Sequence, residues 1–80
     1  MSILASKVSS DVMDVQVSEA DLIVRLLDGR TVSAPLAWFP RLLHGTAEQR
    51  HNWRRISKGG GIHWPDLDED ISVRSLLATS

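Results

Sequence analysis

The fold is decided by the stretch LIVRLLDGRTVSA, which spans residues 22–34. Its first six residues are apolar apart from Arg25 and carry β-branched side chains at their centre, as strands do. Asp28 and Gly29 then give the strongest short hairpin signal, because both central positions of a type I′ turn need a positive φ. Residues 30–34 predict the returning strand, so we expect an antiparallel hairpin here.

A further strand is expected just before this hairpin. Residues 12–17, with the sequence VMDVQV, alternate in polarity, so Met13, Val15 and Val17 would share one face of a strand. The short segment SEAD between the two strands would form a turn. Residues 11–34 therefore predict an antiparallel β-meander.

A helical segment is expected over residues 35–58. Pro35 ends the sheet because proline has no N–H to donate to a ladder. Pro40 is tolerated only in the first turn of a helix, which predicts a short helix from about Phe39 to His44.

A capping box predicts the second helix of this segment. Thr46 and Gln49 have the required spacing, so the helix would run from Ala47 to about Ser57. Its spacing places Trp53 and Ile56 on the buried side and the arginines in solvent.

The remaining part of the chain predicts shorter elements. Three glycines at 59–61 would turn the chain, residues 62–64 would form a short strand, and the acidic residues 66–70 would form a loop or a sheet edge. Ser72 would cap a last helix over residues 73–78.

Together these elements predict one small α+β domain over residues 1–80, with the antiparallel meander packed against two or three short helices. A chain of 80 residues and 8.9 kDa has room for one domain, because two would each be too small to bury a stable core. Residues 1–10 are expected to form a flexible N-terminus.

The composition argues against several classes of partner. A net charge of −1 gives no bulk electrostatic reason to bind nucleic acid or an anionic membrane. No apolar run approaches the roughly 20 residues of a membrane-spanning helix, so no membrane partner is expected. The absence of cysteine favours a reducing compartment, and we expect a cytoplasmic protein.

The charge is unevenly distributed along the chain. Residues 41–58 contain five basic residues and one acidic residue, whereas residues 59–80 contain one basic and four acidic residues. Neutralisation within the fold is the simpler interpretation of two opposite neighbouring segments. It predicts that Arg54 or Arg55 lies near the carboxylates of residues 68–70.

The sequence shows no arrangement typical of an enzyme, a metal site or a cofactor site. His44, His51 and His63 lack the i,i+4 spacing that supplies two ligands from one helix face. No serine stands in a Gly-x-Ser-x-Gly setting. We therefore expect no catalytic residue, no metal and no cofactor.

Basic residues of the predicted second helix are the candidate contacts for nucleic acid. Arg50, Arg54, Arg55 and Lys58 would follow phosphates, and an exposed Trp53 would stack on a base. The same tryptophan is needed as the apolar anchor of the helix, which favours a solvated basic face without a nucleic-acid partner.

Aromatic residues are the candidate contacts for a protein partner. The chain has three tryptophans and one phenylalanine, and a small domain needs most of them in its core. Tryptophan also concentrates binding energy at interfaces, so Trp38 and Trp64, with the neighbouring His63, are candidate partner contacts.

Four runs of the sequence carry a resemblance to a known family. They are LDGR (27–30), PLAWFPRL (35–42), TAEQRHNW (46–53) and GIHWPDLDEDIS (61–72). With them the chain resembles, over about residues 10–78, the bacterial family catalogued as domain of unknown function 2442.

The resemblance implies a small α+β domain. In some longer members this domain is joined to a DNA-binding helix-turn-helix, and short members are often encoded beside a second small protein. That pairing resembles a toxin–antitoxin operon and implies an antitoxin-like role. It assigns no catalytic residue.

The function expected from the sequence is that of a small bacterial protein-interaction module. Its partner would be the product of a neighbouring gene, or a second copy of the chain in a homodimer. The alternative is a nucleic-acid-binding accessory domain that uses the basic residues of 47–58.

Overall fold

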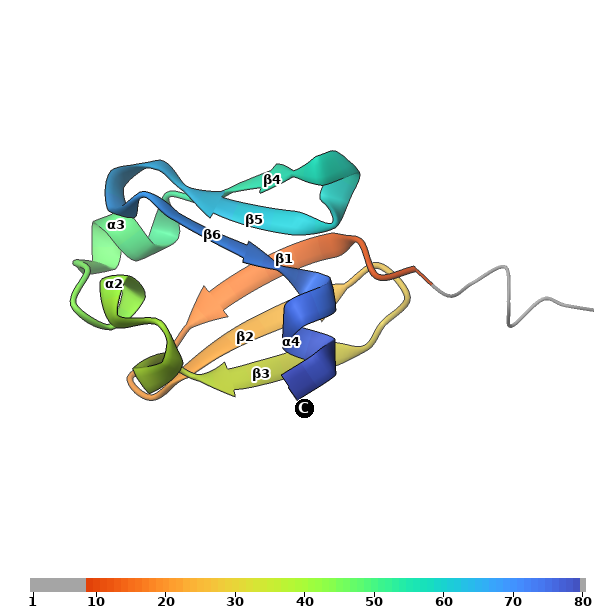
Figure 1. The fold of residues 1–80 in the computed structure, drawn as a ribbon, viewed down its shortest axis with the longest axis horizontal. Helices are drawn as coiled ribbons and strands as arrows, with labels where there is room; N and C mark the ends of the chain where they lie inside the picture. The colour runs from red at the N-terminus through yellow and green to blue at the C-terminus, as the bar shows by residue number, and fades with distance from the viewer. Residues whose placement is uncertain (1–8, 80) are drawn as a thin grey trace, which may run out of the picture.

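The computed structural model describes residues 9–79, so the N-terminal segment expected to be flexible lies almost entirely outside the described residues. Within them the chain forms a small α+β domain built on two three-stranded antiparallel sheets (Figure 1). The strands are β1 (Val12–Val17), β2 (Asp21–Leu26), β3 (Thr31–Pro35), β4 (Arg54–Ile56), β5 (Gly61–Trp64) and β6 (Glu69–Ser72). The helices are α2 (Pro40–Leu43), α3 (Ala47–His51) and α4 (Val73–Thr79), with 3₁₀ turns η1 (Leu36–Trp38), η2 (Ser57–Gly59) and η3 (Pro65–Leu67).

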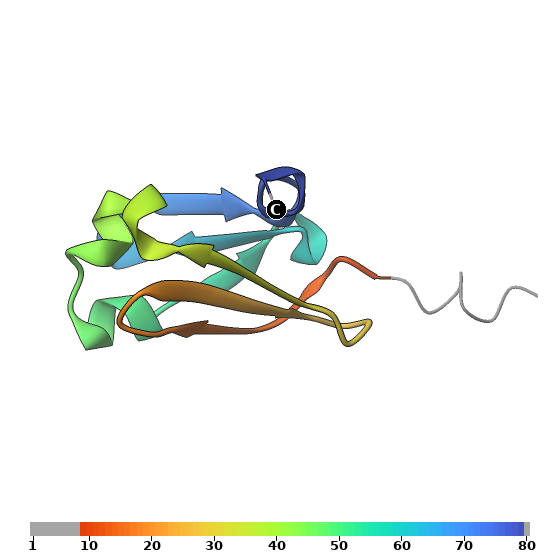
Figure 2. The same ribbon diagram turned by 90° about the horizontal axis from the view of Figure 1, so that it is seen from below.

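The first sheet is the predicted meander, with strand order β1-β2-β3. The second sheet has the order β4-β5-β6 and lies above the first in Figure 1. Helices α2 and α3 gather at one end of the sheets, whereas α4 lies toward the other end and contacts β3 and β6 (Figure 2). The expected α+β class is confirmed.

Strand β1 contains a β-bulge. Its register with β2 shifts between Val12 and Asp14, so Met13 is the extra residue. The predicted shared face of Met13, Val15 and Val17 is therefore wrong at Met13, which is 43% exposed, while Val12 is buried with Val15. The extra residue reverses the alternation of side chains, which a strict period of two does not predict.

The turn between β2 and β3 also differs from the expected type. Gly29 donates its N–H to the Leu26 carbonyl at 3.0 Å, and Leu26 donates to the Arg30 carbonyl at 2.9 Å. Gly29 has a φ of 96°, but Asp28 does not have a positive φ. The hairpin thus has a three-residue loop ending in a left-handed glycine, in place of the two-residue type I′ turn.

The predicted second helix is much shorter than expected. Its capping box is confirmed, because Thr46 accepts from the Gln49 backbone and the Gln49 side chain accepts from the Thr46 backbone. However, α3 ends at His51, and residues 54–56 form β4. The Arg55 guanidinium lies 5.6 Å from the centre of the Trp53 ring, a contact that i,i+2 residues make on one face of a strand and not on a helix.

The last part of the chain forms the expected short elements. The short strand at 62–64 is part of β5, and Ser72 caps α4 by accepting from the Ser75 N–H at 3.1 Å. The acidic stretch, expected as a loop or a sheet edge, contains both, because it follows the turn η3 into the edge strand β6, where Glu69 pairs with Trp64.

The core lies between the two sheets and the helices that cover their ends. It contains Val12, Val15, Leu22, Val24, Leu26, Val32, Ala34, Leu36, Leu42, Ile62, Trp64, Ile71, Val73 and Leu76. Trp53 packs against this cluster without being buried, and Ile56 is likewise half-buried, so the expected burial of both residues is met only in part.

Candidate functional site

A groove of about 540 Å³ lies between β1 and α3. Residues 14–18 form one wall with Ile23, and Ala47, Arg50 and His51 form the other. This volume is in the range of sites that bind small molecules or short peptide segments. The groove is therefore the candidate functional site.

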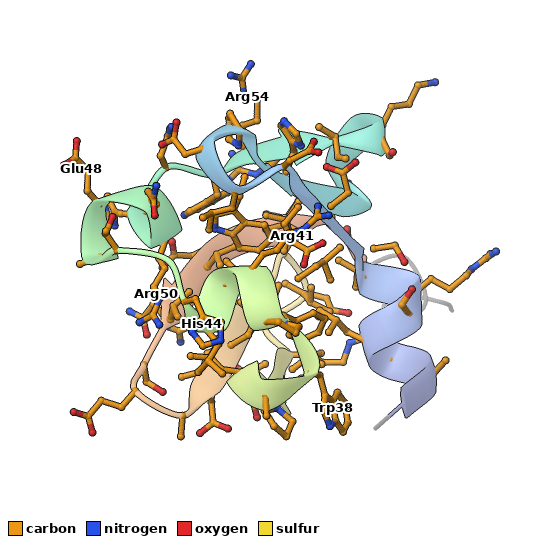
Figure 3. The ribbon with its side chains drawn as sticks, turned by 60° about the vertical axis from the view of Figure 1, so that its left-hand side comes forward. Trp38, Arg41, His44, Glu48, Arg50 and Arg54 are labelled. Carbon is orange, nitrogen blue, oxygen red and sulfur yellow. The ribbon has the colours of Figure 1, made fainter. Side chains whose placement is uncertain are left out.

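Arg50 is held rigidly at this groove. Its Nε donates to the Leu42 carbonyl at 2.7 Å and its Nη2 donates to the Leu43 carbonyl at 2.6 Å. These carbonyls belong to the end of α2, where the last carbonyls of a helix lack intrahelical partners. Arg50 thus caps α2 while it lines the groove, and Figure 3 shows it between the helices while Glu48 and Arg54 project outward.

The other polar groups of the groove are less constrained. His51 is exposed and Asp14 is half-buried, and within residues 9–79 neither side chain has a hydrogen-bond or ion-pair partner. Ser18 accepts from the Asp21 N–H at 3.0 Å in the turn that follows β1. The groove therefore offers one fixed cation, one free imidazole and one free carboxylate.

Arg55 does not form part of a basic face, although the sequence suggested it. Its Nε donates to the Val12 carbonyl and its Nη2 donates to the Met13 carbonyl, both at 2.7 Å. These carbonyls lie at the bulge of β1. The guanidinium therefore connects the edges of the two sheets.

Two of the four basic candidates have side chains that make no hydrogen bond or ion pair within the described residues. Arg54 and Lys58 are exposed, whereas the guanidinium groups of Arg50 and Arg55 bind carbonyls of this chain. Because phosphate recognition needs several free cations, the expected basic helix is reduced to two separate side chains.

The tryptophans occupy three different environments. Trp64 is 0% exposed and its Nε1 donates to the Arg50 carbonyl at 3.0 Å, so it is a core residue and offers no surface to a partner. Trp53 is half-buried. Trp38 is 52% exposed at the end of η1 and projects from the surface in Figure 3, so it remains a candidate contact.

The carboxylates of the acidic stretch, residues 66–70, pair with residues other than the predicted Arg54 and Arg55. Arg41 lies 3.9 Å from the Asp68 carboxylate and also donates to the Asp68 carbonyl. His63 Nδ1 pairs with Asp70. The expected pairing of Arg54 or Arg55 with residues 68–70 is wrong, because Arg55 reaches β1 instead and Arg54 has no ion pair within the described residues.

His63 nevertheless has ordered neighbours on the outer face of the second sheet. It pairs with Arg54 across β4 and β5 and with Asp70 across β5 and β6. The three side chains form a row in which the Asp70 carboxylate fixes the orientation of the imidazole. The row lies outside the groove.

The described residues offer neither a metal-binding cluster nor a membrane-spanning helix. Residues 9–79 contain no cluster of three or more His, Asp or Glu side chains that could hold a metal ion. None of their helices is long and apolar enough to cross a membrane.

The sequence did not indicate Asp14, Gln16 or His51 as site residues. No signal in the sequence brings them together, because the groove arises only when α3 folds against β1. The sequence also did not indicate Arg41 as a partner of Asp68, because the two residues are 27 positions apart in the chain.

Comparison with known proteins agrees with this small two-sheet α+β class. Residues 12–80 match the family described as "Protein of unknown function (DUF2442)", and the chain belongs to that family. It is also similar to the crystal structure of a protein of unknown function from Rhodospirillum rubrum, with 27% sequence identity, a TM-score of 0.72 and coverage of 86% of each chain. The comparison with curated proteins gave no match.

Proposed function

We propose that this protein is an interaction module that binds another protein in the groove between β1 and α3. The observation that carries the proposal is the groove itself, whose volume of about 540 Å³ exceeds what a single side chain would fill. Its walls combine the apolar side chains Val17 and Ile23 with the polar groups of Asp14, Arg50 and His51. Such a mixture supports recognition of a peptide segment.

The biological role that we propose for this binding is that of the antitoxin-like half of a two-protein system in the bacterial cytoplasm. The partner would be the product of a neighbouring gene. This role is supported by the family resemblance and by the exposed Trp38, a residue type that often dominates binding energy at interfaces.

Co-expression with the neighbouring gene product, followed by affinity purification, tests the proposal. The wild-type chain should retain the partner, and Ala47→Trp, which fills the groove from the α3 wall, should release it. Ala78→Trp is the matched control, because Ala78 is an exposed alanine of α4 that neither lines the groove nor adjoins Trp38 in the chain. Absence of a complex with the wild-type chain, together with a neighbour that is harmless when expressed alone, would contradict the proposal.

A further inference from the structure

The polar groups of the groove indicate the chemistry of the segment that it binds. We infer that the groove takes an internal, extended segment of the partner and recognises one acidic side chain, whose carboxylate lies against Arg50 and His51. This inference rests on the proposed function and adds the chemistry of the partner.

Arg50 is suited to bind a carboxylate because its position is already fixed. A guanidinium has five N–H donors, and two of those of Arg50 are used by the carbonyls of Leu42 and Leu43. The remaining donors have no partner within residues 9–79. A cation that is ordered before binding loses little conformational entropy when a carboxylate arrives.

His51 adds a second polar group on the same wall. His51 follows Arg50 directly in α3 and is exposed. Its side chain has no hydrogen-bond or ion-pair partner within the described residues. An imidazole N–H donates a hydrogen bond to a carboxylate. The α3 wall therefore complements an anion.

Asp14 on the opposite wall limits how many acidic residues the groove accepts. Its half-buried carboxylate has no ion-pair partner within the described residues, so it would repel a second negative charge placed near it. A segment with one acidic residue near Arg50 and an uncharged residue near Asp14 fits better than a uniformly acidic segment.

The length of the groove favours a continuous segment of several residues over a single chain-terminal residue. The groove follows five consecutive residues, 14–18, which correspond to about 13 Å of strand and to about four residues of an extended ligand. Because α3 already contacts β1, this edge is not free to add a complete strand, and recognition depends on side chains.

Binding of two blocked tetrapeptides to the full chain, followed by ¹H-¹⁵N NMR, tests the inference. The first peptide is acetyl-Val-Glu-Val-Gln-amide and the second has Gln in place of Glu. The Glu peptide should bind at least about fivefold more tightly, with chemical-shift changes confined to residues 14–18 and α3. Equal affinities, no binding of either peptide, or shifts centred on Arg54 and Lys58 would overturn the inference.

Charge variants of Ala47 make the test independent of Arg50, whose removal would also uncap α2. Ala47 is exposed and lines the groove, so Ala47→Lys should strengthen and Ala47→Glu should weaken binding of the Glu peptide. Ala37→Lys and Ala37→Glu, outside the groove, should leave the affinity unchanged. The same response at both positions would overturn the inference.

Three outcomes separate parts of this inference from the proposed function. If Ala47→Trp releases the natural partner while Ala47→Lys and Ala47→Glu retain it equally, the groove binds the partner but recognition of a carboxylate is refuted. If a peptide with a free terminal carboxylate binds more tightly than the blocked Glu peptide, the internal segment is refuted. If the Glu peptide binds as expected but no protein partner is retained, the recognition chemistry stands and the proposed function fails.

Discussion

Arg55 Nε donates a hydrogen bond to the carbonyl oxygen of Val12 at 2.7 Å, although the two residues are 43 positions apart. Val12 begins β1 and Arg55 lies in β4, so this contact joins strands of two different sheets. A second bond to the Met13 carbonyl makes the contact bidentate. The guanidinium thereby satisfies backbone carbonyls at the bulge that would otherwise need water.

Loss of this contact should destabilise the protein. Arg55→Met keeps the aliphatic stem and removes both donors, so we expect the free energy of unfolding to fall by about 1–3 kcal/mol. Urea denaturation followed by circular dichroism measures the change. Arg54→Met, at an exposed side chain of the same strand, should stay within about 0.5 kcal/mol of the wild type, and equal losses at both positions would refute the role of Arg55.

The conformation of the first hairpin loop can be tested at Gly29. This residue has a φ of 96° and no atom within 4 Å of an added Cβ, so Gly29→Ala introduces backbone strain without a clash. We expect a loss of about 1–2 kcal/mol in thermal or urea unfolding. Gly60→Ala is the control, because Gly60 has a φ of −83° and should accept alanine with no loss of stability. Equal effects at the two glycines would contradict the observed loop.

The stability of the same loop should depend on pH through Asp28. The backbone N–H of Arg30 is the largest cause that lowers the pKa of Asp28 below its ordinary value of 3.8. Desolvation opposes it with the next largest effect, and the backbone N–H of Ser9 and the Arg30 guanidinium lower the pKa further. A lowered pKa means that the ionised carboxylate stabilises the folded state, with the full contribution above the unfolded pKa. That contribution is lost as the pH falls through the folded pKa.

Asp28→Asn should therefore be less stable than the wild type at neutral pH, and the difference should shrink below about pH 4. Chemical denaturation at a series of pH values measures it. A difference that stays constant down to pH 2 would show that the charge of Asp28 does not stabilise the loop.

The three tryptophans should differ in their access to a soluble quencher. In single-tryptophan variants, iodide should quench Trp38 strongly, Trp53 partly and Trp64 hardly at all, because their side chains are exposed, half-buried and fully buried. Quenching of Trp64 comparable to that of Trp38 would contradict its placement in the core.

The salt dependence of DNA binding distinguishes the nucleic-acid alternative. Each phosphate contact contributes about −0.9 to the slope of log K against log salt concentration. With Arg54 and Lys58 as the free cations of the basic segment, we expect weak binding with a slope no steeper than about −2 in fluorescence anisotropy. A slope near −4, reduced by Arg50→Ala and Arg55→Ala, would favour the nucleic-acid interpretation.

Local signals in the sequence predicted several elements well. The meander, the capping box of Thr46 and Gln49 and the Ser72 cap each depend on residues close together in the chain. Their geometry follows from side-chain period and from hydrogen bonds that span a few residues, so no distant segment is needed to specify them.

Apart from the type of the first hairpin turn, the errors occur where a distant segment decides the local conformation. The apolar spacing of Trp53 and Ile56 fits a helix, but pairing with β5 and the bonds of Arg55 to β1 stabilise a strand at residues 54–56. Likewise, alternation in residues 12–17 fits a regular strand, whereas the structure contains a bulge at Met13. Neither the strand pairing of residues 54–56 nor the bulge at Met13 can be recognised from a local sequence pattern.

Local sequence patterns specify the α+β class, the strands of the first sheet and the N-terminal caps of α3 and α4, because those features depend on local propensity and capping. The sequence also indicates which side chains carry charge, but not which of them lack a partner in the folded chain. Contacts between distant segments determine that Arg50 and Arg55 bind carbonyls, that Trp64 is buried and that Asp14 and His51 face one groove. A long side chain such as that of an arginine can reach several different acceptors, and the packing of α3 and β4 against β1 determines which of these acceptors it binds.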